Sequence, residues 1–171
     1  MSYRFLLASD MDYTLLLPGM DVSDKNKKAI QALKDNGIAL TLATGRTPFL
    51  VGRYVDDLAI DMPVIASNGG ELYDFSSRSH IFSASIPEAT TRQLLNIFFD
   101  KRIDFTGYAN EAVYFSPDST RRDFFDKYND GLAEEKKAIV RTFEKNMLSL
   151  QELPKFNKFL LVDCEEEIIT S

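Results

Sequence analysis

The sequence has almost no cysteine, the residue that forms disulfides in oxidising compartments. Its 171 residues include one cysteine, one histidine and no tryptophan. The single cysteine, Cys164, excludes an internal disulfide, and its apolar neighbours favour a buried structural thiol over a nucleophile. The N-terminal apolar run ends at Ala8, too short for a signal peptide, and no apolar stretch approaches the length of a membrane span. We therefore expect a cytoplasmic protein with no membrane partner.

A long block of basic residues is also missing. The chain has 20 Lys and Arg against 26 Asp and Glu, for a net charge of -6, which argues against a nucleic-acid surface. Four lysines lie on one expected helix and indicate a solvated face: Lys25, Lys27, Lys28 and Lys34. A composition of 44% hydrophobic and 27% charged residues is typical of a globular protein. The expected partner is therefore a small molecule.

The first half alternates short apolar segments with amphipathic helices. Segments 5–8, 38–43 and 63–66 have the length and composition of buried strands, and the first is expected to be buried on both faces. Ser23 and Thr47 stand where helix N-caps belong, and a proline follows Thr47 directly. The β-α-β-α-β order predicts an α/β fold with a Rossmann-like parallel sheet.

All three expected strands end in small or polar residues. The tips are Ser9-Asp10, Thr44-Gly45 and Ser67-Asn68. Ligands of open α/β sheets bind at the carboxyl ends of the strands. Polar residues commonly follow buried strands, and this tendency would explain the polar residues at any single tip. It explains less well why the three tips carry an acid pair, a hydroxyl beside glycine, and an amide beside two glycines.

Asp10 and Asp12 are spaced so that an extended chain would present both on one face. Two carboxylates that converge repel each other, and a shared proton or a bound cation relieves the repulsion. Oxygen ligands of this kind suit Mg²⁺. The alternative is that both are solvated turn residues, because Asp is common after strands. The pair alone leaves both interpretations open.

The pattern changes after residue 70. Residues 71–74 and 80–83 indicate a hairpin, in which His80 is expected to be an exposed strand residue rather than a base or ligand. Ser85-Ile86-Pro87 leads into a second unit of mixed helices and strands, which divides the chain into residues 1–84 and 85–171. The second unit is expected to contain a helix after Pro87, paired strands at 103–108 and 112–116, a helix capped by Asp118, a helix from about 133 to 145, and a strand at 156–164.

Together, these motifs resemble the haloacid dehalogenase-like phosphatases, particularly the Cof-type sugar-phosphatase branch with a large α+β cap domain. The D-x-D-x-T motif is present as Asp10-Met11-Asp12-Tyr13-Thr14, and the second motif as Thr44-Gly45-Arg46. Ser67-Asn68-Gly69-Gly70 matches the turn after the third strand of this branch. The resemblance is close over residues 3–86, a partial phosphatase core, and makes residues 85–171 a cap domain.

The resemblance implies a chemistry for the acid pair. Asp10 would attack phosphorus to form an aspartyl-phosphate. Asp12 would be the general acid toward the leaving alkoxide and then the base toward water, a role favoured if it holds a proton near neutral pH. The implied cofactor is Mg²⁺, held by Asp10 and the main-chain carbonyl of Asp12.

The other two tips would bind the substrate. By the resemblance, the Thr44 hydroxyl and the backbone N–H groups at Gly45 bind phosphate oxygens. Arg46 and Asn68 would reach substrate oxygens, with Gly69 in the same turn. Arg46 could equally be a structural ion-pair partner.

Two departures from the family pattern stand out. Tyr13 occupies a position that is often glycine in this branch, and a bulky residue there could narrow the entrance. The chain also stops before the catalytic lysine and the acidic motif that completes the Mg²⁺ site; Lys155 and Lys158 lie at the wrong place to replace that lysine. We therefore expect the first strand to be an exposed edge, and the chain either to self-associate or to be a fragment of a longer protein.

The leading interpretation is a Mg²⁺-dependent phosphatase that hydrolyses a small phosphorylated metabolite, a sugar phosphate by the resemblance. One alternative is an inactive remnant that binds phosphate or a partner, and another is a phosphomutase. Nucleotide-binding folds are disfavoured because the chain has no G-x-G-x-x-G after the first strand and no G-x-x-x-x-G-K-[ST].

Overall fold

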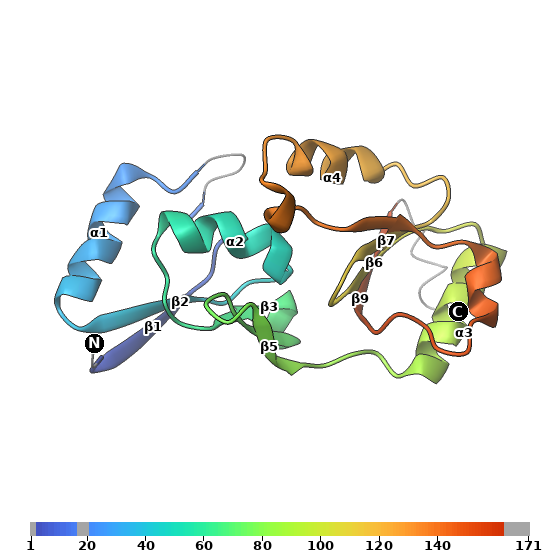
Figure 1. Ribbon diagram of the computed structural model, residues 1–171, viewed down its shortest axis with the longest axis horizontal. Coiled ribbons are helices and arrows are strands. Elements are labelled where there is room, and N and C mark those ends of the chain that lie inside the picture. The colour runs from blue at the N-terminus through green and yellow to red at the C-terminus, as the bar shows by residue number, and fades with distance from the viewer. Residues whose placement is uncertain (1–2, 17–20, 163–171) are drawn as a thin grey trace. The chain divides into compact units, whose positions relative to one another are not determined.

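The computed structural model describes residues 3–16 and 21–162. The chain forms two compact units, Met1–Ser83 and Ala84–Ser171 (Figure 1). The division lies one residue before the boundary expected from the sequence. The expectation for Cys164 falls outside the described residues.

The first unit is built on parallel strands followed by an antiparallel hairpin. β1 and β2 are parallel neighbours, and a parallel bridge between Ala43 and Ile65 connects β2 to β3. β3, β4 and β5 then pair antiparallel in order. The parallel β-α-β-α-β arrangement expected from the sequence is confirmed. The strands are β1 (Phe5–Ser9), β2 (Ile38–Leu42), β3 (Val64–Ala66), β4 (Glu71–Asp74) and β5 (Ser79–Ser83).

Two helices connect the parallel strands, α1 (Asp24–Asp35) and α2 (Pro48–Asp57). Ser23 caps α1, because its Oγ accepts a hydrogen bond from the Asn26 N–H at 3.2 Å. Thr47 is the N-cap residue of α2, but its hydroxyl makes no capping bond. The helices bury their apolar stripes in one cluster with the strands, which includes Ile30, Leu40, Leu42, Val51, Tyr54, Val55 and Val64.

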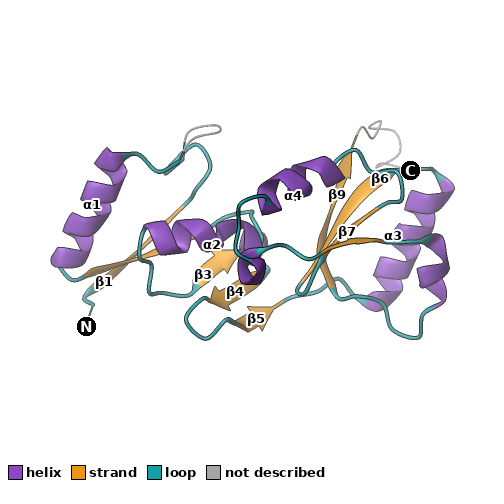
Figure 2. Ribbon diagram, turned by 45° about the horizontal axis from the view of Figure 1, so that its top comes forward, coloured by secondary structure: helices purple, strands orange, loops and turns teal. Residues whose placement is uncertain are grey.

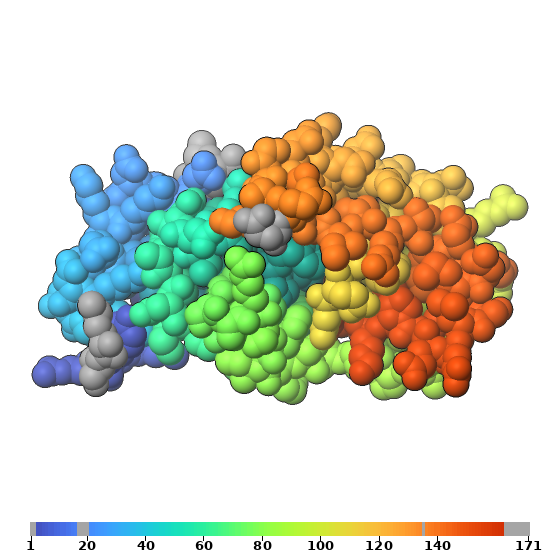
Figure 3. Space-filling view, in the orientation of Figure 1, coloured from blue at the N-terminus to red at the C-terminus, as the bar shows by residue number. Residues whose placement is uncertain are grey.

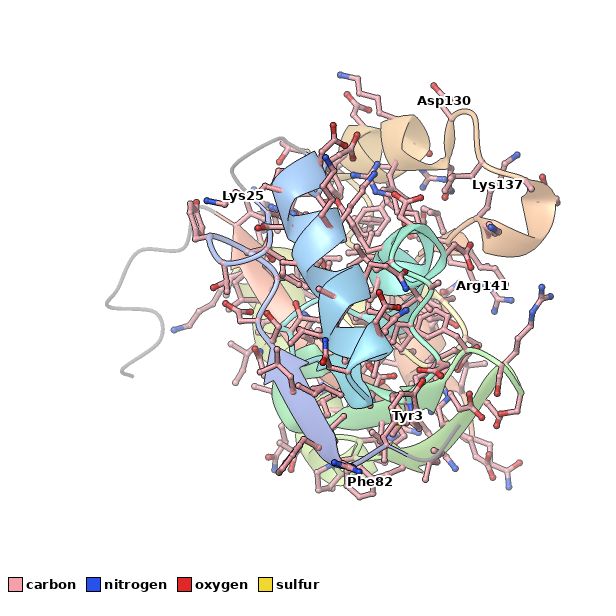
Figure 4. The ribbon with its side chains drawn as sticks, turned by 90° about the vertical axis from the view of Figure 1, so that its left-hand side faces the viewer. Tyr3, Lys25, Phe82, Asp130, Lys137 and Arg141 are labelled. Carbon is pink, nitrogen blue, oxygen red and sulfur yellow. The ribbon has the colours of Figure 1, made fainter. Side chains whose placement is uncertain are left out.

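The lysines of α1 do not all share one environment. Lys25, Lys27 and Lys28 are exposed, and Figure 4 shows Lys25 pointing outward from the helix. Lys34 instead donates to the main-chain carbonyl of Leu58 at 2.7 Å and to that of Ala59. The solvated face expected from the sequence is therefore correct for three of the four lysines, while Lys34 links α1 to the end of α2.

β1 is not buried on both faces. Phe5, Leu6 and Leu7 are 69%, 57% and 43% exposed. Among the described residues, β1 pairs with β2 alone. The expectation of a first strand buried on both faces is thus wrong for the described residues. The expectation of an exposed edge is met.

An exposed apolar edge strand pairs readily with other chains. We expect the weight-average mass of this chain, measured by light scattering, to rise with concentration, and Leu6→Lys to suppress that rise. Ile97→Lys is the matched control, because Ile97 is also exposed (44%) but lies on a helix of the second unit. A wild-type chain that stays monomeric over the whole concentration range would contradict this expectation.

The second unit is a four-stranded sheet in the order β8-β7-β6-β9, with a helix on each face (Figure 2). Residues of β6 that are an odd number of positions apart lie on opposite faces of the sheet: Phe105 packs with Phe98 of α3, and Tyr108 packs with Phe125 of α4. The elements are α3 (Glu88–Asp100), β6 (Asp104–Ala109), β7 (Val113–Phe115), α4 (Arg122–Asn129), β8 (Val140–Thr142) and β9 (Phe156–Val162).

Two expectations for this unit are wrong. Residues 133–145 do not form one helix: a 3-10 turn at Glu134–Lys136 is followed by β8, which pairs with β7 in parallel. The Glu- and Lys-rich sequence favours a helix locally, but the sheet recruits the β-branched segment Val140–Thr142 and buries Phe143 completely. Asp118 is not the cap of α4, whose N-cap residue is Arg121.

No helix in the described parts of the chain is both long and apolar enough to cross a membrane.

Candidate functional site

Backbone hydrogen bonds hold the three strand tips together. The Ala43 N–H donates to the Ser9 carbonyl at 2.9 Å, which joins the first tip to the second. The Ser67 N–H donates to the Arg46 carbonyl at 2.9 Å, and the Asn68 N–H to the Thr44 carbonyl at 3.0 Å, which join the second tip to the third. The polar residues expected to share one edge of the sheet are therefore brought to that edge.

Asp10 presents its carboxylate to solvent directly after β1. Its Oδ1 accepts a hydrogen bond from the Met11 N–H at 2.8 Å. The chain then turns sharply, since the Met11 carbonyl accepts from the N–H groups of Thr14, Leu15 and Leu16, while the Met11 side chain is 1% exposed. Met11 thus anchors the turn in the core and leaves Asp10 accessible.

Asp12 lies within this turn and is paired with an arginine rather than with Asp10. Arg46 Nε donates to Asp12 Oδ2 at 3.0 Å, and Arg46 Nη2 donates to Oδ1 at 2.6 Å. This two-point hydrogen bonding lowers the pKa of Asp12. In this arrangement Arg46, rather than a neighbouring carboxylate, is the main influence on the pKa of Asp12, because β1 ends at Ser9 and the guanidinium faces the Asp12 side chain.

Arg46 is itself held by Tyr54 of α2. Its guanidinium carbon lies 5.4 Å from the Tyr54 ring centroid, and Nη1 lies 3.4 Å from the Tyr54 hydroxyl. The ion-pair alternative for Arg46 is therefore the state seen here. Tyr54 has the spacing of an ordinary helix core residue, and nothing in the sequence distinguished it as a support for the site.

Thr44 and Gly45 form the middle of the site. Thr44 is 5% exposed, and its Oγ1 accepts a hydrogen bond from the Arg46 N–H at 3.2 Å. A Cβ at Gly45 would lie 2.7 Å from Asn68 Oδ1, so only glycine lets the amide of Asn68 lie at that distance. Gly69 follows Asn68 with a φ of +86°, a conformation that suits glycine.

Tyr13 has a φ of 62° and is 82% exposed. A left-handed backbone at this position explains why glycine suits the motif there, because a residue with a Cβ is strained in that region. The side chain of Tyr13 is largely in solvent.

The donors for a metal ion are few. No group of three or more His, Cys, Asp or Glu side chains suited to a metal lies within the described residues. Asp10 and the Asp12 carbonyl are oxygen donors of the kind that Mg²⁺ prefers, but the Asp12 carboxylate is engaged with Arg46. The donor chemistry therefore fits Mg²⁺, whereas the number of protein ligands in this part of the chain is small.

His80 is not the exposed strand residue that was expected. Its side chain is 22% exposed, and its Nε2 lies 2.8 Å from Oε1 of Glu71, whose side chain is 2% exposed. Glu71 also accepts a hydrogen bond from the Ser67 hydroxyl. Nothing in the sequence marked this pairing, because it depends on how the hairpin returns beside the third strand tip.

The sequence profile of the haloacid dehalogenase-like hydrolases matches residues 7–170 of this chain. Among curated relatives, 5-amino-6-(5-phospho-D-ribitylamino)uracil phosphatase YwtE of Bacillus subtilis is 34% identical over 107 residues, 63% of this chain and 36% of that protein. Pyridoxal phosphate phosphatase YbhA of Escherichia coli is 26% identical over 110 residues, 64% of this chain and 40% of that protein. The aligned part of the chain thus spans well under half the length of these relatives.

Solved structures share the fold. A haloacid dehalogenase-like hydrolase from Bacteroides thetaiotaomicron superposes with a TM-score of 0.73 at 17% identity, over 99% of this chain and 61% of that one. A sugar phosphatase of subclass IIB superposes with a TM-score of 0.64 at 17% identity, over 84% of this chain and 54% of that one. The α/β fold class expected from the sequence is confirmed, and so is the family resemblance.

Proposed function

This chain belongs to the haloacid dehalogenase-like hydrolases, and from that premise we propose that it hydrolyses the phosphomonoester of a small metabolite. The observation that carries the proposal is the exposed Asp10 carboxylate at a sheet edge where two further strand tips supply Thr44, Gly45 and Asn68. A nucleophile beside phosphate-binding donors is the arrangement that phosphoryl transfer needs.

The chemistry has two balanced steps. In the first, an Asp10 oxygen bonds to phosphorus, the bond from phosphorus to the alkoxide breaks, and Asp12 gives its proton to that alkoxide. In the second, water attacks the aspartyl-phosphate, Asp12 accepts the proton of the water, and the Asp10 carboxylate and inorganic phosphate are released. The Thr44 hydroxyl and the N–H of Gly45 are proposed to hold phosphate oxygens.

The Asp12–Arg46 pair must loosen for the first step. An ionised carboxylate that accepts two hydrogen bonds from a guanidinium has no proton to give. We propose that substrate oxygens draw Arg46 away from Asp12, so that Asp12 gains a proton when substrate is bound. Arg46 is only 30% exposed at its side chain, which places it at the wall of the site rather than in open solvent.

Mg²⁺ is the proposed cofactor, with Asp10 and the Asp12 carbonyl as two of its ligands. When bound, the ion would offset the repulsion between the Asp10 carboxylate and the phosphate anion.

The names of similar proteins support a substrate class for this chain. Two are phosphatases of a phosphorylated ribitylaminouracil and of pyridoxal phosphate, and a structural neighbour is a sugar phosphatase. These substrates are all phosphate esters of small polar metabolites. We propose the same class for this chain, with a sugar phosphate as the first candidate.

A second candidate function is binding without turnover, and it is favoured by the small number of acidic ligands among the described residues.

The test that separates these functions is hydrolysis of p-nitrophenyl phosphate with Mg²⁺ and with EDTA. Mg²⁺-dependent turnover supports the phosphatase. No turnover, together with measurable binding of inorganic phosphate, would support the binding protein instead. Appearance of a phosphorylated acceptor in place of free phosphate would indicate a mutase.

Gly45→Ala tests whether the close approach of Asn68 to the Thr44-Gly45 tip matters for substrate binding. Because the new Cβ would lie 2.7 Å from Asn68 Oδ1, the amide must move. We expect kcat/KM to fall roughly tenfold through KM, a loss comparable to one hydrogen bond to a charged group, with little change in the urea midpoint. Gly52→Ala is the control: its Cβ would meet only a Phe75 ring carbon, at 3.3 Å. Unchanged KM in Gly45→Ala would show that Asn68 does not reach the substrate.

A further inference from the structure

Glu71 is a buried acidic side chain that the proposed chemistry does not use. It is the first residue of β4, directly after the turn that carries Asn68, and its side chain is 2% exposed. A carboxylate is costly to bury unless hydrogen bonds satisfy it. Both of its oxygens have such partners.

One partner lies in the turn before β4 and the other lies on β5. The Ser67 hydroxyl donates to Oε2 of Glu71, and His80 Nε2 of β5 lies 2.8 Å from Oε1. The imidazole of His80 is fixed in turn by the ring of Tyr73, edge-on at a centroid distance of 4.9 Å. Figure 3 shows the β4–β5 segment in green at the surface of the first unit. The His80 side chain is 22% exposed, whereas that of Glu71 is 2% exposed.

The turn that Glu71 contacts needs an anchor. Ser67 and Asn68 have φ angles of 50° and 56°, and two successive non-glycine residues in the left-handed region are strained. Their N–H groups are bound to the Arg46 and Thr44 carbonyls. The Ser67 hydroxyl also donates to Glu71, so the same turn is bound through a side chain as well as through its backbone.

We infer that Glu71 is a positioning residue: through Ser67 it holds the left-handed turn that places the Asn68 amide against Gly45, where the phosphate is proposed to bind. The inference rests on the proposed function in that Asn68 is taken to contact the phosphate ester. Glu71 itself does not touch substrate. His80 completes the anchor by satisfying the second carboxylate oxygen.

The test uses the whole chain with inorganic phosphate as the probe. Two readouts are measured for each variant: the dissociation constant for phosphate, and hydrogen exchange at the N–H groups of Ser67 and Asn68. The variants are Ser67→Ala, Glu71→Ala and Glu71→Gln. Asp74→Ala is the matched control, because Asp74 lies on the same strand but accepts from Ser76 and Ser77 in the hairpin loop.

We expect Ser67→Ala and Glu71→Ala to weaken phosphate binding about tenfold and to speed exchange at both N–H groups by a similar factor. Glu71→Gln should stay near wild type, because a glutamine can accept from His80 and donate to the Ser67 oxygen. Asp74→Ala should change neither readout. If Glu71→Ala does not fold, Ser67→Ala and Glu71→Gln still test whether the hydrogen bond between residues 67 and 71 holds the turn.

A second comparison separates positioning from general support of the fold. In an Asn68→Ala background, Ser67→Ala should no longer change phosphate affinity, because the group that it positions is gone. Equal loss of affinity in both backgrounds would overturn the inference, and so would unchanged exchange at Ser67 and Asn68 in Ser67→Ala. A wild-type chain that binds no phosphate would contradict the proposed function. Hydrogen exchange at the Ser67 and Asn68 N–H groups would then still test whether Glu71 holds the turn.

Discussion

Replacing Asp10 with asparagine is expected to reduce hydrolysis of p-nitrophenyl phosphate in Mg²⁺ on the order of 10⁴-fold, the loss typical of removing a nucleophile that acts with its partners as a unit. The amide has nearly the shape of the carboxylate but cannot form the acyl-phosphate bond. Asp10 is exposed, and within the described residues its carboxylate accepts one hydrogen bond, from the neighbouring Met11 N–H. The substitution should therefore leave the urea midpoint close to that of the wild type.

The control for this substitution is Asp57→Asn, an equally conservative change at an exposed aspartate that ends α2. It should leave the rate within about twofold of wild type, since surface changes away from a site are nearly neutral. Turnover of Asp10→Asn at the wild-type rate would show that a different residue is the nucleophile.

Replacing Arg46 with alanine is expected to raise the pKa of Asp12 toward its ordinary value of 3.8. The hydrogen bonds from Arg46 are the largest influence on that carboxyl, and they favour its ionised form. Carbon-13 NMR titration of labelled aspartate carboxyls would measure the shift. Arg46→Lys should give an intermediate pKa, because it keeps the charge but loses the two-point geometry.

The same substitution has a pH-dependent effect on stability. Since the folded-state pKa of Asp12 lies below its unfolded value, the ion pair stabilises the fold above about pH 4, and this contribution is lost as the pH falls through the folded pKa. The Asp12 side chain is 46% exposed, so solvent screening limits the contribution to about 0.5 kcal/mol. Arg46→Ala should therefore lower the urea midpoint slightly at neutral pH and not in strong acid. A pKa of Asp12 that is the same in both proteins would contradict the ion pair.

Much of the first unit could be predicted from the sequence because its signals are local. Apolar runs of strand length, the Ser23 cap and the proline after Thr47 each specify structure within a few residues. They were confirmed apart from the missing Thr47 capping bond and the exposure of β1. The convergence of the three tips followed from the parallel order, since parallel strands end at the same edge.

The remaining features depend on contacts distant in sequence. Val140–Thr142 became a strand only because β7 offers an edge, against the local preference of its neighbours for helix. Asp12 was expected to face Asp10, but a guanidinium 34 positions away takes its carboxylate. Glu71 and His80 meet across a hairpin whose register shifts between Leu72 and Tyr73, which sequence periodicity does not reveal.

The measurement that tests the central claim most directly is acid quenching of the protein during turnover of a phosphate ester, followed by mass spectrometry of its peptides. The account predicts one added phosphoryl group on the carboxylate of Asp10, absent from the Asp10→Asn variant. Steady turnover with no phosphorylated peptide, or with the phosphoryl group on another residue, would contradict Asp10 as the nucleophile.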